Sequence, residues 1–445
     1  MLVLLSAGLG VLAFPPVHWH GLALVYLLPF FLAIRGAKPE TAVLLGLVHG
    51  LALFCGTLHW LLAVFGPFAL LLHFILALFP AIFAGALAGL EKRFAKPWVW
   101  PWIVGILWAG IEHFRSEWFT LRFAWITPGT GLPPGALTPL IGVYGISLVI
   151  ATGCAFLSMG GRQRWAGFTL LLLTLLSCHR PPRLSEPGQL QVAAVQSEEM
   201  SANRLFDLSD RIDRADAIIW PEYAIDFDPR HNPEFMARVQ ELLIAKHAEV
   251  LVLGGRVDLE PKRWQNTAFA IGRQGVLGTH VKNRPVHFFD DGEAGTEAPA
   301  ISSPLGIFSM PICFDNDYAA VQRRAVANGA SFLLIPSMDA AHWTATQHLQ
   351  HGELFRHRAA ENGRYLVVAA TSGLTQAIDD RGRRIDSLPL FAPGLLETRI
   401  SPSHHTTVYQ RGGWLVGPVC TMIALGLVGA GVILPRIRRR NPSGE

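Results

Sequence analysis

The chain has 445 residues, of which 51% are hydrophobic and only 16% are charged, and its mean hydropathy is +0.34. Average proteins contain about 25% charged residues, so neither a disordered chain nor an ordinary soluble enzyme fits this composition. The charge is also uneven, because residues 1–185 hold 15 of the 70 Asp, Glu, Lys and Arg residues. These values predict a membrane region followed by a more soluble region.

Long runs without Asp, Glu, Lys or Arg occupy residues 1–34, 41–90, 123–161 and 412–435. A helix that crosses a bilayer needs about 20 predominantly apolar residues, because each residue rises about 1.5 Å through a core about 30 Å thick. The run 41–90 therefore predicts two spans that fold back at Gly66-Pro67. The run 1–34 breaks at Pro15-Pro16 and leaves one or two short helices. A signal peptide is the alternative there, but no basic residue precedes the apolar stretch.

Basic residues cluster between the apolar runs, and short cytoplasmic loops collect such residues. The clusters are Arg35/Lys38, Lys92/Arg93/Lys96, Arg162/Arg164 and Arg436/Arg438/Arg439/Arg440. All four lie on one side of the membrane only if an even number of spans separates neighbouring clusters. Further spans near 98–113, 136–160, 165–178 and 413–434 meet this condition. We therefore expect about eight transmembrane helices with both termini in the cytoplasm.

The expected domains follow from this topology. Residues 1–185 contain the first seven transmembrane helices, 186–410 form a domain outside the cytoplasm, 411–435 form the last helix, and 436–445 form a basic cytoplasmic tail. An outer domain of roughly 225 residues lies within the ordinary size range. The basic loops account for the formal net charge of +4, so the charge gives little reason to expect a nucleic-acid partner.

The outer domain alternates short apolar runs with polar stretches of helical spacing. By length and β-branched content, strands are expected at Gln191–Gln196, Ala217–Trp220, Val250–Gly254, Ile307–Cys313, Phe332–Pro336 and Leu366–Thr371. Helices are expected at 201–214, 233–248, 317–329 and 345–362. Strands that alternate with helices predict a layered α/β domain.

Two charged side chains follow predicted strands of this domain. Glu222 comes after the strand 217–220, and a carboxylate at the mouth of an apolar site has a raised pKa that suits general acid–base catalysis. Lys282 follows the hairpin-like stretch 266–281 and could stabilise an oxyanion or lower the pKa of a nearby thiol. Taken singly, a glutamate at this position is more often a solvated strand-end residue, and a lysine is more often a surface cation.

Cys313 is the one cysteine of the outer domain, because Cys55, Cys154 and Cys420 fall in apolar spans and Cys178 ends one. It therefore has no disulfide partner within its domain. It ends a predicted strand, and the following Phe314-Asp315-Asn316-Asp317 is typical of a helix start. N–H groups at such a turn favour a thiolate and can receive an oxyanion. A small buried core residue is the alternative for a single cysteine.

Together, Glu222, Lys282 and Cys313 resemble the Glu-Lys-Cys constellation of the nitrilase superfamily, and Trp220 and Pro221 before the glutamate strengthen the match. More specifically, the whole chain resembles the apolipoprotein N-acyltransferases, bacterial inner-membrane enzymes that add the third acyl chain to lipoproteins. Further segments that carry this resemblance are Trp108 with Glu112, Phe123-Ala124-Trp125, 142–148, 336–340, 358–364 and 409–412.

The resemblance implies an αββα sandwich for the outer domain and a two-step acyl transfer. Glu222 would act as the base, Cys313 would accept an acyl chain from a phospholipid as a thioester, and Lys282 with the N–H of Phe314 would hold the oxyanion. The acceptor would be the α-amine of a diacylglyceryl-modified lipoprotein cysteine. The resemblance also implies a monomer in the bacterial inner membrane, with its catalytic domain on the periplasmic side and with no metal or other cofactor.

Some positions depart from the family pattern. The family has a second glutamate after the lysine, and here Asp290 keeps its distance from Lys282 whereas Glu293 keeps its place after a glycine. The tyrosine and glutamate expected after the cysteine are Phe314 and Asp315. These changes leave open a membrane-anchored nitrilase-like amidase, or a paralogous acyltransferase with another amine acceptor. A non-catalytic scaffold is disfavoured because the three central residues are intact.

Two other features of the outer domain have weaker interpretations. A metal site could be drawn from His348, His351, Glu353 and His357, but histidines at this helical spacing without a strong third ligand more often serve packing. The segment Asp290–Ala300 is rich in Gly, Pro and acidic residues and is a candidate lid.

Overall fold

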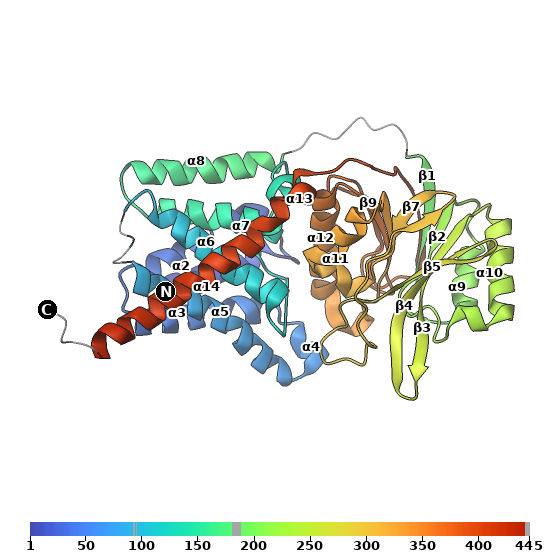
Figure 1. The fold of residues 1–445 in the computed structure, drawn as a ribbon, viewed down its shortest axis with the longest axis horizontal. Helices are drawn as coiled ribbons and strands as arrows, with labels where there is room; N and C mark the ends of the chain where they lie inside the picture. The colour runs from blue at the N-terminus through green and yellow to red at the C-terminus, as the bar shows by residue number, and fades with distance from the viewer. Residues whose placement is uncertain (92–93, 95, 180–187, 441–445) are drawn as a thin grey trace. The chain divides into compact units, whose positions relative to one another are not determined.

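A computed structural model gives the structure of residues 1–91, 94, 96–179 and 188–440 (Figure 1). Several expectations concern residues outside these ranges: Lys92 and Arg93 of the second basic cluster, the boundary between residues 185 and 186, and the tail residues 441–445. The chain forms two compact units. The first contains the described residues of 1–180 and 411–445, and the second contains those of 181–410.

The first unit is helical, and helices occupy the apolar runs of the sequence. Its segments are α1 (Leu2–Ala13), η1 (His20–Leu24), α2 (Leu27–Ile34), α3 (Pro39–Thr57), α4 (Leu61–Phe65), α5 (Phe68–Leu90), α6 (Trp100–His113), the π-helical turn η2 (Phe114–Trp118), η3 (Pro128–Gly131), α7 (Thr138–Leu157), α8 (Arg162–Ser177), η7 (Gly413–Leu415) and α14 (Val416–Arg440), with α13 (Val408–Arg411) before η7. The run 1–34 forms two helices that are separated at Pro15-Pro16, and Gly66-Pro67 lies between α4 and α5 as predicted.

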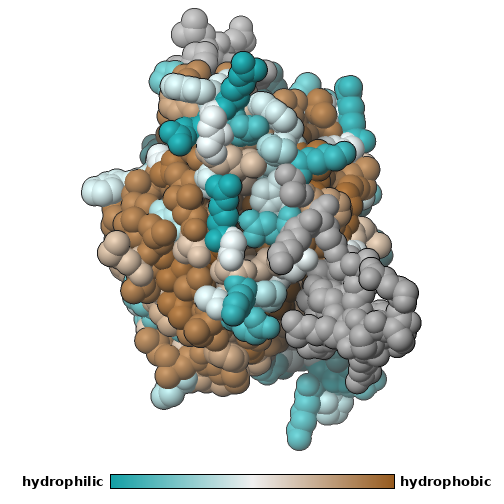
Figure 2. All heavy atoms as spheres, turned by 90° about the vertical axis from the view of Figure 1, so that its left-hand side faces the viewer, coloured by the Kyte–Doolittle hydropathy of each residue, from teal (hydrophilic) through white to brown (hydrophobic). Residues whose placement is uncertain are grey.

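The lengths of these helices bear on the predicted spans. Among the described residues, α3, α5 and α7 are long and apolar enough to cross a bilayer, whereas Leu2–Ala13, His20–Ile34 and Gly413–Gly429 are apolar but shorter. Large hydrophobic side chains such as Leu44 and Leu173 are more than half exposed. On the face drawn in Figure 2, hydrophobic side chains cover a large area. An exposed apolar surface of this kind is suited to contact with lipid. The total of eight spans remains a prediction.

Two small residues one helical turn apart allow α3 and α5 to pack closely. A Cβ atom on Gly46 would lie 2.5 Å from the carbonyl oxygen of Pro80, and one on Gly50 would lie 2.7 Å from the Cα of Ala77. Small residues spaced in this way let helix backbones approach one another within membranes. The contact of α3 with α5 therefore depends on the absence of side chains at both glycines.

The second unit contains two six-stranded sheets, with the strand orders β12-β1-β2-β3-β4-β5 and β11-β10-β9-β8-β7-β6. The strands are β1 (Leu190–Gln196), β2 (Ala217–Ile219), β3 (Val250–Glu260), β4 (Arg263–Gly272), β5 (Gly275–Val281), β6 (Ile301–Ser303), β7 (Gly306–Ser309), β8 (Phe332–Pro336), β9 (Tyr365–Ala369), β10 (Gln376–Ile378), β11 (Arg384–Ser387) and β12 (Gly394–Ile400). In each sheet the three middle strands, β1-β2-β3 and β9-β8-β7, are parallel, and the outer strands are antiparallel.

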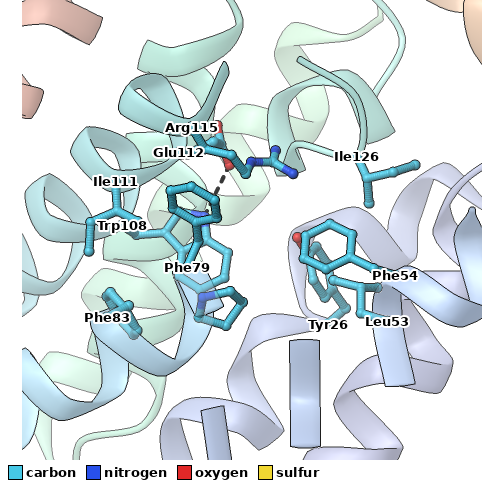
Figure 3. A pocket seen from close by; sticks show the side chains of 11 residues that line it. Tyr26, Leu53, Phe54, Phe79, Phe83, Trp108, Ile111, Glu112, Arg115 and Ile126 are labelled. Carbon is cyan, nitrogen blue, oxygen red and sulfur yellow. Dashed lines mark hydrogen bonds between the residues drawn. The ribbon is translucent and has the colours of Figure 1, made fainter. Parts of the chain in front are cut away.

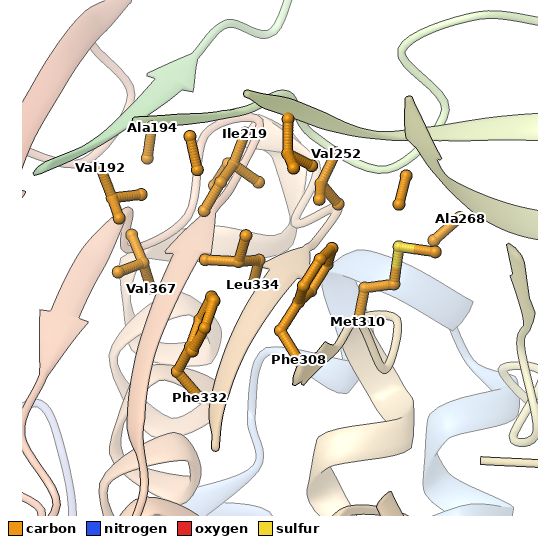
Figure 4. Packing of buried hydrophobic residues seen from close by; sticks show 14 of the residues in the cluster. Val192, Ala194, Ile219, Val252, Ala268, Phe308, Met310, Phe332, Leu334 and Val367 are labelled. Atoms are coloured by element: carbon orange, nitrogen blue, oxygen red, sulfur yellow. The ribbon is translucent and has the colours of Figure 1, made fainter. Parts of the chain in front are cut away.

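The sheets face each other across one hydrophobic core, in which Ile219 and Val252 of the first sheet meet Phe308 and Leu334 of the second (Figure 4). The helices α9 (Ala202–Ser209) and α10 (Pro233–Ala245) cover the outer face of the first sheet. On the second sheet, α12 (Thr344–Asn362) covers the outer face and α11 (Ala319–Ala327) packs beside it. The unit is therefore the α/β sandwich that the sequence predicts.

One predicted strand is too long. The expected strand Ile307–Cys313 is only four residues long in the structure, because β7 ends at Ser309. Pro311 has no N–H to donate to a sheet, which helps to end the strand there. The residues between β7 and Cys313 thus form a connecting segment and not the end of a strand.

We expect Gly46→Ala to destabilise the first unit, because the new methyl group would collide with the backbone of α5. Overpacking of this kind costs about 1–3 kcal/mol. The measurement is the thermal unfolding midpoint of the full-length protein in detergent. The matched control is Gly8→Ala on α1, where a Cβ would have no atom within 4 Å. Equal midpoints for the two variants would contradict this account of the helix contact.

Candidate active site

Cys313 begins a short 3-10 helix, η5 (Cys313–Asp317), that follows β7. Its φ angle is +43°, a conformation that costs energy in a residue with a side chain and that recurs at functional sites. The side chain is 4% exposed, and the thiol donates a hydrogen bond to the carbonyl oxygen of Met338, 3.4 Å away. The backbone thus holds a buried thiol at a sharp turn. The sequence predicts the helix start after Cys313, but it wrongly places Cys313 at the end of a strand.

Glu222 is fully buried just after β2 and is held through one of its two oxygens. Its Oε1 accepts hydrogen bonds from Lys282 Nζ at 2.8 Å and from Asn266 Nδ2 at 2.7 Å. The other oxygen, Oε2, is buried and has no hydrogen-bond partner among the described residues. An ionised carboxylate oxygen without a donor is available to accept a proton.

Lys282 lies between two carboxylates, and the second one belongs to Asp291. Lys282 Nζ is 2.7 Å from Asp291 Oδ2, and both side chains are almost completely buried. Asp291 also accepts hydrogen bonds from the Tyr223 hydroxyl, from Asn266 Nδ2 at 2.8 Å and from the N–H of Val286 at 2.7 Å. Glu222, Lys282 and Asp291 therefore form one buried ionic network.

This network corrects the expectation that Asp290 or Glu293 stands beside Lys282. Asp290 is exposed and accepts a hydrogen bond from Trp264 Nε1 at 3.1 Å. The side chain of Glu293 is 42% exposed and pairs with Arg263 at 2.5 Å. Gly292 has a φ of +76° and pairs with Gln265 at the edge of β4, and this turn directs Asp291 inward and its two acidic neighbours outward.

The buried charges shift the pKa values of the whole network. Burial raises the pKa of Glu222, and Lys282 opposes this effect. Burial alone would lower the pKa of Lys282, but Glu222 and Asp291 raise it well above its ordinary value. Burial also raises the pKa of the Cys313 thiol well above the usual range, with a further contribution from Glu222. These shifts favour a protonated thiol and a charged lysine, so a reaction at the Cys313 thiol would need a base.

Asp315 connects the turn of Cys313 to the segment of Lys282. Its carboxylate accepts hydrogen bonds from the N–H groups of Asn283 at 2.9 Å, Arg284 at 2.8 Å and Ile312 at 3.1 Å. It also lies 2.8 Å from Nε2 of His280, a buried residue of β5 that precedes Lys282 by two positions. Asp315 was expected near the site from sequence, and the structure gives it a positioning role.

The other two expected supporting residues, Phe314 and Trp220, make mainly packing contacts. The Phe314 ring meets Tyr318 edge-on with the ring centroids 5.2 Å apart. Trp220 is fully buried in the core between the first sheet and its helices, where its Nε1 donates to Ser209 Oγ at 2.9 Å and its ring packs against Phe206. Trp220 therefore supports β2 from the side of α9 and does not join the ionic network.

A second buried ionic cluster, which the sequence did not predict, lies around the segment that accepts the Cys313 hydrogen bond. His351 Nδ1 is 2.8 Å from Asp339, the residue after Met338, and His351 Nε2 is 3.3 Å from Asp317 of η5. Burial alone would lower the pKa of His351, but the two carboxylates raise it to about 10. Because both ring nitrogens face carboxylates, His351 acts as a cationic bridge, which differs from the metal-ligand alternative.

A signal for this cluster was present in the sequence. Asp339 follows the predicted strand 332–336 by three residues, and the ends of strands were the criterion that selected Glu222 and Lys282. Its partner His351 lies 12 residues further on, inside a helix. That pairing depends on how the loop between them folds, which residue patterns do not specify.

Comparisons with known proteins agree with this architecture. Residues 6–156 match the model of the apolipoprotein N-acyltransferase N-terminal domain, and residues 189–409 match that of the carbon-nitrogen hydrolases. Over 99% of its length the chain is 25% identical to an apolipoprotein N-acyltransferase of Geobacter metallireducens, of which 95% is covered. It is 26% identical to that of Pseudomonas syringae pv. tomato, with 95% of each chain covered.

Among solved structures, the chain is similar to an amidase from Nesterenkonia sp., with 18% identity, a TM-score of 0.42 and coverage of 50% of this chain and 94% of the amidase. The two family models together span most of the chain, and the curated relatives align with nearly all of it. The chain therefore belongs to the apolipoprotein N-acyltransferase family, and its residues 189–409 form a carbon-nitrogen hydrolase domain.

Proposed function

We propose that this protein transfers an acyl chain from a membrane phospholipid, through a thioester on Cys313, to the α-amine of the diacylglyceryl-modified cysteine of a lipoprotein. The observation that carries the proposal is the buried Cys313 thiol, which interacts electrostatically with both Glu222 and Lys282. Oε2 of Glu222 has no partner among the described residues, and the charged Lys282 pairs with the other oxygen of Glu222. Full-length relatives named apolipoprotein N-acyltransferase support the choice of substrates.

In the first step Glu222 Oε2 takes the thiol proton while Cys313 Sγ attacks the ester carbonyl of the phospholipid. Lys282 and the N–H of Phe314 stabilise the negative charge that develops on the carbonyl oxygen. The C–O bond to the glycerol then breaks, and the leaving oxygen takes the proton back from Glu222. The products of this step are a lysophospholipid and an acyl thioester on Cys313.

In the second step the α-amine of the lipoprotein cysteine attacks the thioester. Its nitrogen forms a bond to the acyl carbon, the C–S bond breaks, and Glu222 moves the amine proton to the departing thiolate. An amide is more stable than a thioester, so the transfer needs no nucleotide. No step in this scheme uses a metal or another cofactor.

Two residues position this machinery without touching the substrate in our scheme. Asp291 forms a second ion pair with the Lys282 ammonium and raises the pKa of Glu222 through its negative charge. Asp315 fixes the turn of Cys313 against the segment that carries Lys282. Preorganised charge of this kind is a main source of catalytic stabilisation.

We also infer a monomeric protein in the bacterial inner membrane, with about eight spans and the catalytic unit on the periplasmic side. The basic clusters of the short loops support this orientation. The three described helices that are long and apolar enough to cross a bilayer support the membrane location. Both proposed substrates are lipids, so a membrane enzyme meets them where they are concentrated.

We expect Cys313→Ala to abolish acyl transfer, because the variant has no atom that can carry the acyl chain. The measurement uses purified full-length protein, phospholipid with a labelled acyl chain and a diacylglyceryl peptide. The wild type should carry label on Cys313 without the peptide and should pass it to the peptide amine, whereas the rate in the variant should fall by at least about 10³-fold. The thermal unfolding midpoint of the variant serves as the folding control.

Two results of this experiment would count against the proposal. Turnover retained in Cys313→Ala would exclude the thioester mechanism. Label that forms on Cys313 but never reaches the peptide would favour a paralogous acyltransferase with another amine acceptor, while no label at all would leave a nitrilase-like amidase as the better reading.

We expect Asp291→Asn to lower kcat by roughly 10- to 100-fold, because a hydrogen bond to a charged partner contributes about 1.5–3 kcal/mol. The negative charge of Asp291 raises the pKa of Glu222, so its removal lowers that pKa. The base then stays ionised at lower pH, and the acidic limb of the kcat/KM profile should move toward lower pH.

The matched control for this variant is Asp290→Asn, which removes the same charge one residue away. Asp290 is exposed and bonds to Trp264, so its kcat should stay within about twofold of the wild type. Should Asp290→Asn lower kcat as much as Asp291→Asn, the assignment of Asp291 as the second carboxylate of the site would be wrong.

A further inference from the structure

The helical unit contains a partly open cavity with about 400 Å³ of empty space, a volume that includes space open to the surroundings. Five of its eleven lining residues are aromatic, and most of the eleven come from α3, α5 and α6. Figure 3 shows Phe79, Phe83 and Trp108 on one side, Phe54 on the other, and Arg115 at one end with its guanidinium directed inward. The cavity therefore joins an apolar space to a polar end that holds both Arg115 and Glu112.

Two hydrogen-bond donors at this cavity lack acceptors in the described part of the chain. Arg115 is 3% exposed; its Nη2 donates to the carbonyl oxygen of Trp125 at 3.0 Å, but its Nη1 has no partner there. Tyr26 is fully buried, and its hydroxyl is also without a partner there. The apolar walls offer no acceptor, and neither donor is hydrogen-bonded to the Glu112 carboxylate in the lining, so both can bond a guest that brings an oxygen atom.

The chemistry of that guest is limited further by Glu112. Its Oε2 accepts a hydrogen bond from Trp108 Nε1 at 3.2 Å, which keeps a carboxyl group beside the cavity. Glu112 and Arg115 are three residues apart on one continuous helical stretch, where side chains are neighbours. A nearby carboxylate disfavours a multiply charged guest such as a phosphate group. A carbonyl oxygen on a hydrocarbon chain matches both the donors and the walls.

The location of the cavity favours such a guest. The cavity lies among helices of which α3 and α5 are long and apolar enough to cross a bilayer. Hydrocarbon supplies no acceptors for buried donors, and ionisable residues at membrane depth usually mark a functional pathway or binding site.

We propose that this cavity binds one lipid acyl chain, with its carbonyl oxygen accepting hydrogen bonds from Arg115 Nη1 and Tyr26 and its first methylene groups packed between Phe54, Phe83 and Trp108. The chain can come from a phospholipid ester or from a free fatty acid. All residues that line this cavity belong to the first unit, and none belongs to the proposed catalytic site, so the inference does not depend on the acyl-transfer proposal.

The test uses full-length Cys313→Ala protein in phosphatidylcholine nanodiscs, so that no probe is consumed by turnover. One arm contains phosphatidylethanolamine with a diazirine in an acyl chain, and the other contains diazirine-labelled palmitic acid. After illumination, peptide mapping should place label on α3 near Phe54 and on α5 near Phe83. The arm that labels these peptides identifies the source of the chain.

Two variants test whether the label reports the cavity. Tyr26→Phe removes one donor and keeps the ring, and it should lower labelling by about 3- to 10-fold. Leu53→Trp fills part of the cavity and should lower labelling by at least about fivefold. The matched control, Leu44→Trp, lies on the same helix with 59% of its side chain exposed, and it should leave labelling unchanged.

The outcomes decide the proposal in either direction. Labelling of the cavity peptides that falls in Tyr26→Phe and Leu53→Trp but not in Leu44→Trp supports an acyl-chain site. No label on these peptides in either arm would mean that water alone satisfies Arg115 and Tyr26, and this would overturn it. Labelling that is unchanged in Tyr26→Phe, or that falls equally in both tryptophan variants, would also overturn it.

Discussion

The buried ammonium group of Lys282 is the constraint on which the catalytic unit depends. Removing a charge from water costs several kcal/mol per ion, so Lys282 is tolerable only between Glu222 and Asp291, at 2.8 and 2.7 Å. The two carboxylates in turn need Asn266, Tyr223 and the N–H of Val286. Loss of one member leaves an uncompensated buried charge, so the whole network is fixed as a unit. A site in which the lysine cannot move is well suited to stabilise an oxyanion at one place.

The same burial keeps the proposed nucleophile, Cys313, protonated in the absence of substrate. A thiol whose pKa is raised well above its usual range stays protonated and reacts slowly with chance electrophiles. Burial also raises the pKa of Glu222, which makes its carboxylate a stronger base. The Asp317–His351–Asp339 cluster adds a rigid support, because Asp317 belongs to the turn of Cys313 and Asp339 follows the carbonyl that accepts its hydrogen bond. These ion pairs thus join the turn of Cys313 to the segment whose carbonyl accepts the thiol hydrogen bond.

The sequence predicts the layered α/β unit and the order of Glu222, Lys282 and Cys313 because apolar runs and strand ends are local features. It does not predict the strand end at Ser309, since Pro311 sits inside an apolar run. It also misses Asp291. The turn at Gly292, with a φ of +76°, directs Asp291 inward and Asp290 and Glu293 outward, and distance along the chain from Lys282 does not reveal this turn. Contacts that depend on loop conformation are the ones that residue patterns cannot supply.

The helical unit illustrates the same limit for membrane topology. Charge-free runs locate the helices, but α1 has 12 residues and extends only about 18 Å, far less than a bilayer core of about 30 Å. The α6 helix continues into the π-helical turn η2, and the chain then runs in an irregular segment to η3. Irregular backbone at membrane depth persists where it is buried in protein or lines a cavity. Arg115 in η2 and Ile126 in the irregular segment both line the cavity, so its polar end exists because this part of the chain departs from regular helix.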